Sequence, residues 1–128
     1  MKMNDYINEF TTHLKEGIEI GNKSVFKSKR KNFNAVLICG LGGSGIGGSI
    51  IKDVLSDKTT IPIIITKDYS IPNFVNNNTL VIASSYSGNT EETISALQKC
   101  QQKGAEIAII TSGGELETIA KNKNYNNI

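Results

Sequence analysis

The hydrophobic pattern of the chain predicts one amphipathic helix followed by alternating strands and helices. At the start, apolar residues recur at spacings of three and four, which aligns them along one face of a helix over residues 4–20. These residues are Ile7, Phe10, Leu14 and Ile18. Continuous apolar runs come next, and such runs are typical of parallel strands covered on both faces. The strands predicted around these runs span residues 35–39, 61–65, 79–84 and 106–111.

Helical patterns lie between and after these runs. They span residues 45–56, 89–103 and 115–123. The order β-α-β-β-α-β-α predicts an α/β fold with a mostly parallel sheet and right-handed crossovers. Pro62 indicates that the second strand lies at a sheet edge, where a missing N–H group is harmless. We therefore predict a flavodoxin-like three-layer α/β/α sandwich with strand order 2-1-3-4-5.

The end of the chain lacks the apolar fifth strand that this fold requires. Residues 122–128 are rich in asparagine, so we expect the sheet to be truncated before its last strand. The 128 residues, 38% hydrophobic and 20% charged, suit a single globular unit. We divide them into an N-terminal helix and basic connector over 1–34 and one domain over 35–128, incomplete at its C-terminus.

Two loops of small residues carry the candidate chemistry. Residues 40–45 follow the first predicted strand and residues 84–90 follow the third, and each loop opens into a helix. In doubly wound sheets the ligand binds at the carboxyl ends of the strands, where the strand order reverses. That point lies between the first and third strands here. Both loops are therefore expected to face one crevice.

The composition of these loops suits a phosphate group. The first turn of a helix has unpaired N–H groups at the positive end of its dipole, and both attract an anion. Gly42 and Gly43 permit close approach of the backbone. Hydroxyls that can donate to phosphate oxygens belong to Ser44, Ser85, Ser87 and Thr90. The competing interpretation of the second-loop hydroxyls is ordinary helix capping and turn formation.

A dinucleotide site is an alternative for the first loop. Gly40, Gly42 and Gly45 have the spacing of the Rossmann fingerprint, and Asp68 follows the second strand, where a ribose-binding carboxylate belongs. This interpretation leaves residues 84–90 without a role. The first loop lacks the lysine of a Walker A motif. The single histidine lies in the first helix, so a Ser-His-Asp triad is not supported.

Charge and cysteine content narrow the choice of partners. The net charge is +2 and there is no tryptophan, so neither nucleic acid nor a membrane surface is an expected partner. The basic residues before the first strand are interpreted as a solvated connector: Lys23, Lys27, Lys29, Arg30 and Lys31. Cys39 and Cys100 lack metal-ligand spacing and are expected to be buried thiols in a reducing, cytoplasmic setting. Residues 1–10 do not resemble a signal peptide, and no apolar run approaches the ~20 residues of a membrane span.

Three segments resemble one known family. Residues 41–48 are similar to the glycine-rich stretch of the bifunctional phosphoglucose/phosphomannose isomerases. Residues 84–93 are similar to their Ser-Tyr-Ser-Gly-Asn-Thr-x-Glu-Thr segment, and residues 68–72 to their Asp-Tyr-x-Leu-Pro. On these motifs the chain is identified as a member of the SIS (sugar isomerase) domain family, most like the N-terminal domain of those isomerases.

The resemblance implies a cytoplasmic, homodimeric enzyme that interconverts glucose 6-phosphate or mannose 6-phosphate with fructose 6-phosphate. It implies no metal and no organic cofactor. Matching positions make the Gly43 backbone and the side chains of Ser44, Ser85, Ser87 and Thr90 the groups that hold the substrate phosphate.

The resemblance leaves the catalytic residues unknown. In the family, the base, an arginine, a ring-opening histidine and a lysine come from later segments, and Arg30 matches none of them. Glu91 and Glu92 are interpreted as helix-dipole residues rather than as the base that isomerisation needs. We therefore expect a phosphate-binding half-site that is inactive alone. A non-catalytic sugar-phosphate sensor stays open as an alternative, although no helix-turn-helix pattern accompanies it.

Overall fold

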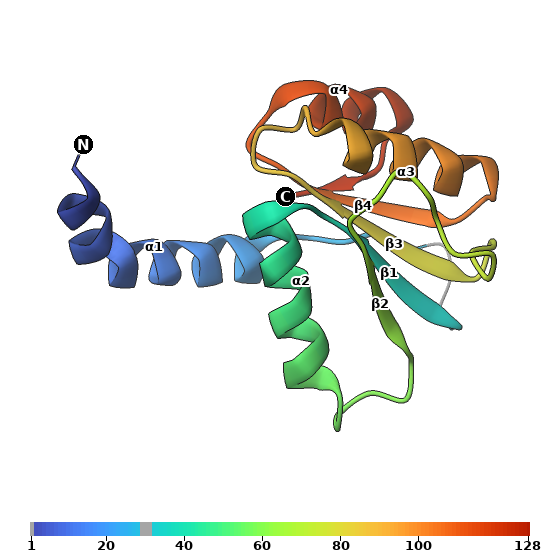
Figure 1. Ribbon diagram of the computed structural model, residues 1–128, viewed down its shortest axis with the longest axis horizontal. Coiled ribbons are helices and arrows are strands. Elements are labelled where there is room, and N and C mark those ends of the chain that lie inside the picture. Colours follow the sequence, from blue (N-terminus) through green and yellow to red (C-terminus); the bar gives the residue numbers. More distant parts are fainter. Residues whose placement is uncertain (1, 29–31) are drawn as a thin grey trace.

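The computed structural model describes residues 2–28 and 32–128 and contains a five-stranded sheet with the order β2-β1-β3-β4-β5 (Figure 1). Every strand pair is parallel. The strands are β1 (Ala35–Cys39), β2 (Ile63–Thr66), β3 (Thr79–Ser84), β4 (Glu106–Ile110) and β5 (Asn126–Asn127). The helices are α1 (Met3–Lys23), α2 (Gly42–Leu55), α3 (Glu91–Gln102) and α4 (Gly114–Lys123). The predicted class, strand order and edge position of β2 are thereby confirmed, whereas Lys29, Arg30 and Lys31 lie outside the described residues.

The fifth strand corrects the sequence prediction. We expected the sheet to stop before its last strand, yet β5 pairs with β4 through Ile109 opposite Asn127. The pairing continues beyond β5, because Ile128 N donates to Ile109 O at 3.0 Å and Thr111 N donates to Ile128 O at 3.1 Å. Parallel pairing uses backbone groups and needs no apolar side chain. A two-residue strand of asparagines therefore leaves no hydrophobic signal in the sequence.

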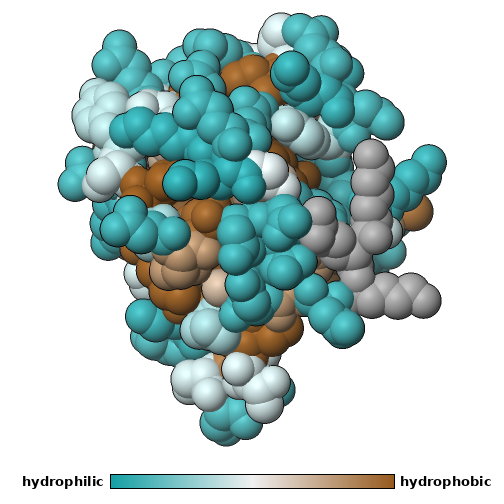
Figure 2. Space-filling model, turned by 90° about the vertical axis from the view of Figure 1, so that its right-hand side faces the viewer, coloured by the Kyte–Doolittle hydropathy of each residue, from teal (hydrophilic) through white to brown (hydrophobic). Residues whose placement is uncertain are grey.

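Register brings the ends of the first four strands to one edge. Cys39 at the end of β1 lies opposite Thr66 of β2 and Ala83 of β3, and Ala83 lies opposite Ile109 of β4. The loops that follow these strands therefore leave the sheet at the same edge. The other edge, where β4 begins, is on the right of Figure 1 and faces the viewer in Figure 2, which shows hydrophobic patches among mostly hydrophilic side chains.

One face of the sheet is fully covered, and we call it the closed face. Successive residues of a strand point to opposite faces, so Leu37 and Ile38 lie on different sides of the sheet. Leu37 belongs to the core cluster that α3 and α4 cover, in which Leu97 and Leu116 are fully buried. The strands add Val81, Ala83, Ile107 and Ile109 to this cluster, each 2% exposed or less.

Among the helices of the described residues, only α2 covers the opposite face, and we call it the open face. A Cβ atom on Gly48 would lie only 3.0 Å from Ile38 Cγ2, so this glycine lets α2 pack closely on β1. Beyond α2 the sheet stays partly exposed, and Ile110 at the end of β4 is 42% exposed. Apolar side chains of α2 are also exposed: Ile46, Ile50, Ile51 and Val54.

Helix α1 projects away from the sheet (Figure 1). It is amphipathic as predicted, but none of its residues is buried. The predicted apolar stripe is therefore in contact with solvent, with Phe10 61% and Leu14 52% exposed. Among the described residues, no helix is both long and apolar enough to cross a membrane.

Candidate functional site

The two predicted loops lie beside each other at the carboxyl edge of the sheet. Strands β1 and β3 are neighbours, so the segments that follow Cys39 and Ser84 start side by side. A cavity of about 190 Å³ joins them, and its lining residues come from the first loop, the second loop and the segment after β4. They are Ser44, Ser84, Tyr86, Ile110, Thr111 and Ser112. The structure thus brings Ser44 to the second loop.

The helices that leave these two loops begin without side-chain caps. Helix α2 starts at Gly42, three residues earlier than predicted, and neither its N-cap residue Leu41 nor Thr90, the N-cap of α3, makes a side-chain capping bond. Gly42 has φ +57°, a left-handed conformation that favours glycine. A Cβ on Gly43 would meet no atom within 4 Å. The first-turn N–H groups of α2 therefore have no side-chain cap, and uncapped groups of this kind attract anions.

The predicted hydroxyls of the second loop form one cluster. Ser85 Oγ lies 2.8 Å from Thr90 Oγ1 and 3.4 Å from Ser87 Oγ. Ser85 is only 3% exposed, whereas Ser87 is exposed and Thr90 is half-buried. These three residues do not line the cavity that contains Ser44. The cluster instead lies in the segment that leads directly into α3.

Turn formation accounts for part of this cluster. Gly88 N donates to Ser85 Oγ and Asn89 N donates to Ser87 Oγ, each at 3.2 Å. A hydroxyl that accepts a backbone hydrogen bond still keeps its own proton for donation. Turn formation and anion binding are therefore compatible for Ser87, the exposed member of the cluster.

A third loop braces the second, and sequence analysis missed it. Ser112 N donates to Tyr86 O at 3.2 Å, Glu115 N donates to Asn89 Oδ1 at 2.9 Å, and Leu116 N donates to Gly88 O at 2.9 Å. The run Thr111–Gly114 has the same signature as the first two loops, because small residues follow a strand and precede a helix. Its first helical N–H groups are occupied by the second loop, unlike those of α2.

Glycines make this contact possible. Gly88 has φ +71°, and a Cβ there would collide with the carbonyl oxygen of Gly113. Gly114 has φ +70°, and a Cβ there would collide with the carbonyl oxygen of Ser87. L-residues rarely adopt such conformations. The second and third loops are thus packed backbone against backbone.

The loop after β2 is tied to α3 through Tyr69. Its hydroxyl donates to Glu91 Oε2 at 3.3 Å, and Lys99 Nζ donates to its carbonyl oxygen at 2.6 Å. The pKa of Tyr69 is raised, first by desolvation and then by the carboxylates of Glu92 and Glu91. Asp68 Oδ1 accepts from Tyr69 N at 3.0 Å, so the candidate ribose-binding carboxylate is engaged in its own loop.

The two cysteines are buried thiols, as predicted. Cys39 and Cys100 are free thiols, 1% and 0% exposed, in the core of the closed face. Their mutual hydrogen bond and burial raise the pKa of the Cys39 thiol. In residues 2–28 and 32–128 no group of three or more histidine, cysteine or acidic side chains could hold a metal ion.

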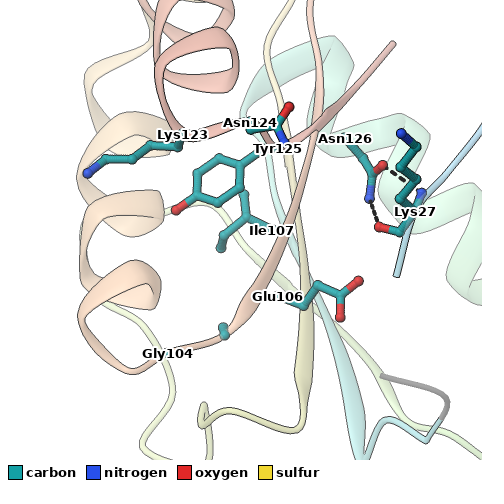
Figure 3. A pocket seen from close by; sticks show the side chains of 9 residues that line it. Lys27, Gly104, Glu106, Ile107, Lys123, Asn124, Tyr125 and Asn126 are labelled. Atoms are coloured by element: carbon teal, nitrogen blue, oxygen red, sulfur yellow. Dashed lines mark hydrogen bonds between the residues drawn. The ribbon is translucent and has the colours of Figure 1, made fainter. Parts of the chain in front are cut away.

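A larger cavity of about 280 Å³ lies at the opposite end of β4 (Figure 3). Glu106 and Tyr125 line it, together with Lys27 and Asn126, which are joined through two hydrogen bonds between the Asn126 amide and the Lys27 backbone. Neither small-residue loop contributes to it. This cavity is therefore separate from the candidate phosphate site.

Comparison with known proteins assigns the family. The SIS domain matches residues 30–127, which is most of the chain. The chain belongs to the SIS domain family. The resemblance drawn from the loop motifs is thereby confirmed, and the three loops at the carboxyl edge are those of a SIS domain.

Several relatives of this SIS domain are phosphosugar enzymes by name. The bifunctional phosphoglucose/phosphomannose isomerase of Caldicellulosiruptor bescii is 46% identical over 112 residues, which cover 88% of the chain and 33% of the relative. The isomerase of the same name from Thermoplasma acidophilum is 51% identical over 84 residues, which cover 66% of the chain and 26% of the relative. A solved Clostridium difficile structure assigned as a phosphosugar isomerase is 26% identical with a TM-score of 0.79, covering 93% of the chain and 36% of that protein.

This SIS domain thus spans about a third or less of the length of those relatives. Their names do not favour the sensor or the dinucleotide-binding alternative.

Proposed function

We propose that this SIS domain holds the phosphate group of a sugar 6-phosphate, as part of an aldose–ketose isomerase that interconverts glucose 6-phosphate or mannose 6-phosphate with fructose 6-phosphate. The supporting observation is the shared cavity: Ser44, at the uncapped start of α2, opens onto the same space as the second loop. Uncapped helix N-termini attract phosphate through free N–H groups and the helix dipole.

The phosphate contacts proposed here divide between the two loops. The Gly43 backbone N–H and the Ser44 hydroxyl act from the first loop, where a Cβ on Gly43 would stand in open space. In the second loop, the Ser85 hydroxyl is already within hydrogen-bond distance of the Ser87 and Thr90 hydroxyls. Hydrogen bonds along such a chain polarise one another, which strengthens a terminal donor toward an anion.

Isomerisation needs a base that moves a proton between C1 and C2, and a group that stabilises the enediolate. Glu91 already accepts a hydrogen bond from Tyr69 and, with Glu92, occupies the first turn of α3, where carboxylates stabilise the helix dipole. We therefore assign these residues no catalytic role, and the 128-residue chain alone is expected to be inactive. The base of the proposed enzyme comes from another part of the longer protein.

The domain division, oligomeric state and location belong to the same proposal. Residues 1–34 act as helix and connector, and residues 35–128 as the phosphosugar-binding domain. The protein is a homodimer, supported by the exposed apolar stripe of α1. It works in the cytoplasm, supported by two free cysteines, which are typical of reducing compartments.

Titration of the chain with fructose 6-phosphate, followed by NMR, tests the phosphate site. Ser87→Ala removes one donor to a charged group, so binding is expected to weaken by about 1.5–3 kcal/mol. Ser56→Ala is the matched control, because its hydroxyl bonds only to Asp53 O in the turn after α2. Unphosphorylated fructose and NAD are expected to cause no shifts in residues 40–45 and 84–90. Equal affinity of the Ser87→Ala and Ser56→Ala variants would remove Ser87 from the site.

A further inference from the structure

Lys67 lies against the first loop from the neighbouring strand. It directly follows β2, whose last residue Thr66 accepts a hydrogen bond from Gly40 N at 3.2 Å. A Cβ built on Gly45 would be 3.3 Å from Lys67 Cε and 3.0 Å from Gly40 O. The last C–N bond adds only ~1.5 Å, so the ammonium group lies within about 5 Å of that point. The side chain of Lys67 therefore extends over the glycine loop.

The charge of Lys67 has no partner in the part of the chain that the structure describes. Among residues 2–28 and 32–128, it takes part in none of the ion pairs or hydrogen bonds. It is also the only basic residue in the four segments that follow β1 to β4. These segments are 40–45, 67–71, 85–90 and 111–114. Lys67 thus supplies an unpaired positive charge at the carboxyl edge of the sheet, whereas the ammonium group of Lys99, which reaches this edge from α3, donates to Tyr69 O.

This position is electrostatically unfavourable without an anion. Stabilising cations lie near the C-terminus of a helix, whereas Lys67 approaches the N-terminal turn of α2, the positive end of its dipole. An anion between the ammonium group and the helix N-terminus would be attracted by both. Among the described residues Asp68 forms no ion pair with the lysine, and its Oδ1 accepts a hydrogen bond from Tyr69 N.

We infer that Lys67 is a substrate-binding residue of this site, which contacts the phosphate group from the β2 side and selects phosphorylated over unphosphorylated sugars. This inference rests on the proposed function, since it assumes that the first loop holds phosphate. It adds a charged contact to a set of otherwise neutral donors. A charge-assisted hydrogen bond is stronger than a neutral one, and its contribution to the binding free energy falls as the ionic strength rises. The contribution of a neutral donor falls less.

The test compares the affinity of the full chain for fructose 6-phosphate and for inorganic phosphate at low and high salt. Lys67→Met is expected to lower the affinity for both ligands about three- to tenfold at low salt. It is also expected to make the affinity depend less on the salt concentration. Lys67→Arg keeps the charge and is expected to stay within about threefold of the original chain. Lys58→Met, on an exposed lysine after α2, is the matched control with no expected effect.

The outcomes separate this inference from the proposed function. If Lys67→Met binds with unchanged affinity and unchanged salt dependence while Ser87→Ala weakens binding, Lys67 is not a substrate contact and the phosphate site stands. If the unmodified chain binds neither fructose 6-phosphate nor phosphate, the proposed function fails and this inference fails with it. Circular dichroism of each variant verifies that the fold is retained, since Lys67 is exposed and supports no core packing.

Discussion

The two faces of the sheet differ in how completely their apolar side chains are buried. On the closed face, α3 and α4 bury Leu97, Leu116 and Ile109 to 1% exposure or less. On the open face, α2 contributes only Gly45 and Gly48 as buried residues, and Ile110 stays 42% exposed. In the absence of a partner, the closed face therefore accounts for most of the folding stability of the chain. The open face and α1 expose apolar surface of the kind that interaction partners cover.

The candidate site lies where the two faces meet. Its first loop enters α2 on the open face, whereas its second loop enters α3 on the closed face. The second loop is held in place by the third, and the first loop has open space beside Gly43. The second loop is thus fixed in position by its neighbour, while the first loop is the more open part of the candidate site.

The largest expected effect is on the closed face. Leu97→Ala leaves a cavity among fully buried side chains and is expected to cost about 2–5 kcal/mol of unfolding free energy. The matched variant on the open face is Ile51→Ala, at a residue 48% exposed, with an expected cost below about 1 kcal/mol. Urea unfolding monitored by circular dichroism measures both. Similar losses of unfolding free energy for the two variants would mean that the two faces contribute equally to stability in solution.

The next effect separates the braced loop from the open helix. Gly88→Ala forces a side chain into a left-handed conformation and against the Gly113 carbonyl, with an expected loss of more than about 1 kcal/mol. Gly47→Ala, in the exposed middle of α2 with no atom within 4 Å of its Cβ position, is expected to gain about 0.5–1 kcal/mol. The melting temperatures of the two variants should shift in opposite directions. A shift in the same direction would contradict the proposed difference between the braced loop and the exposed helix.

The smallest effect on stability is expected in α1. Leu14→Asp removes an apolar side chain that contacts solvent, so the unfolding free energy should change by less than about 0.5 kcal/mol. If the α1 stripe forms a dimer, the same variant should shift the sedimentation coefficient to that of a monomer. Thr12→Asp, on the polar side of the helix, is the control that should leave association unchanged. Dimers that survive Leu14→Asp would exclude the stripe as the interface.

Much of the fold was predictable because its signals are local. Continuous apolar runs marked β1 to β4, and Pro62 marked the edge strand correctly. The early start of α2 was missed because Gly42 and Gly43 are poor helix formers, and tertiary position overrides that preference. Strand β5 was missed because its asparagines pair only through the backbone.

The candidate site was predictable only in part. Both small-residue loops are at the predicted edge, since strand order alone brings them there. Sequence spacing did not reveal that Ser85 and Thr90 bond to each other, because that depends on the path of the turn. It also did not reveal the bracing by residues 111–114 or the approach of Lys67, since both arise from segments that only the folded sheet brings together.

The backbone contact between Gly88 and Gly113, with its counterpart between Gly114 and Ser87, has an evolutionary consequence. Neither segment can gain a side chain or change its length without displacing the other. Substitutions in the two segments should therefore be inherited as a pair, and new ligand preferences should arise at Gly43 of the first loop, where a side chain has space, and in the segment that begins at Lys67.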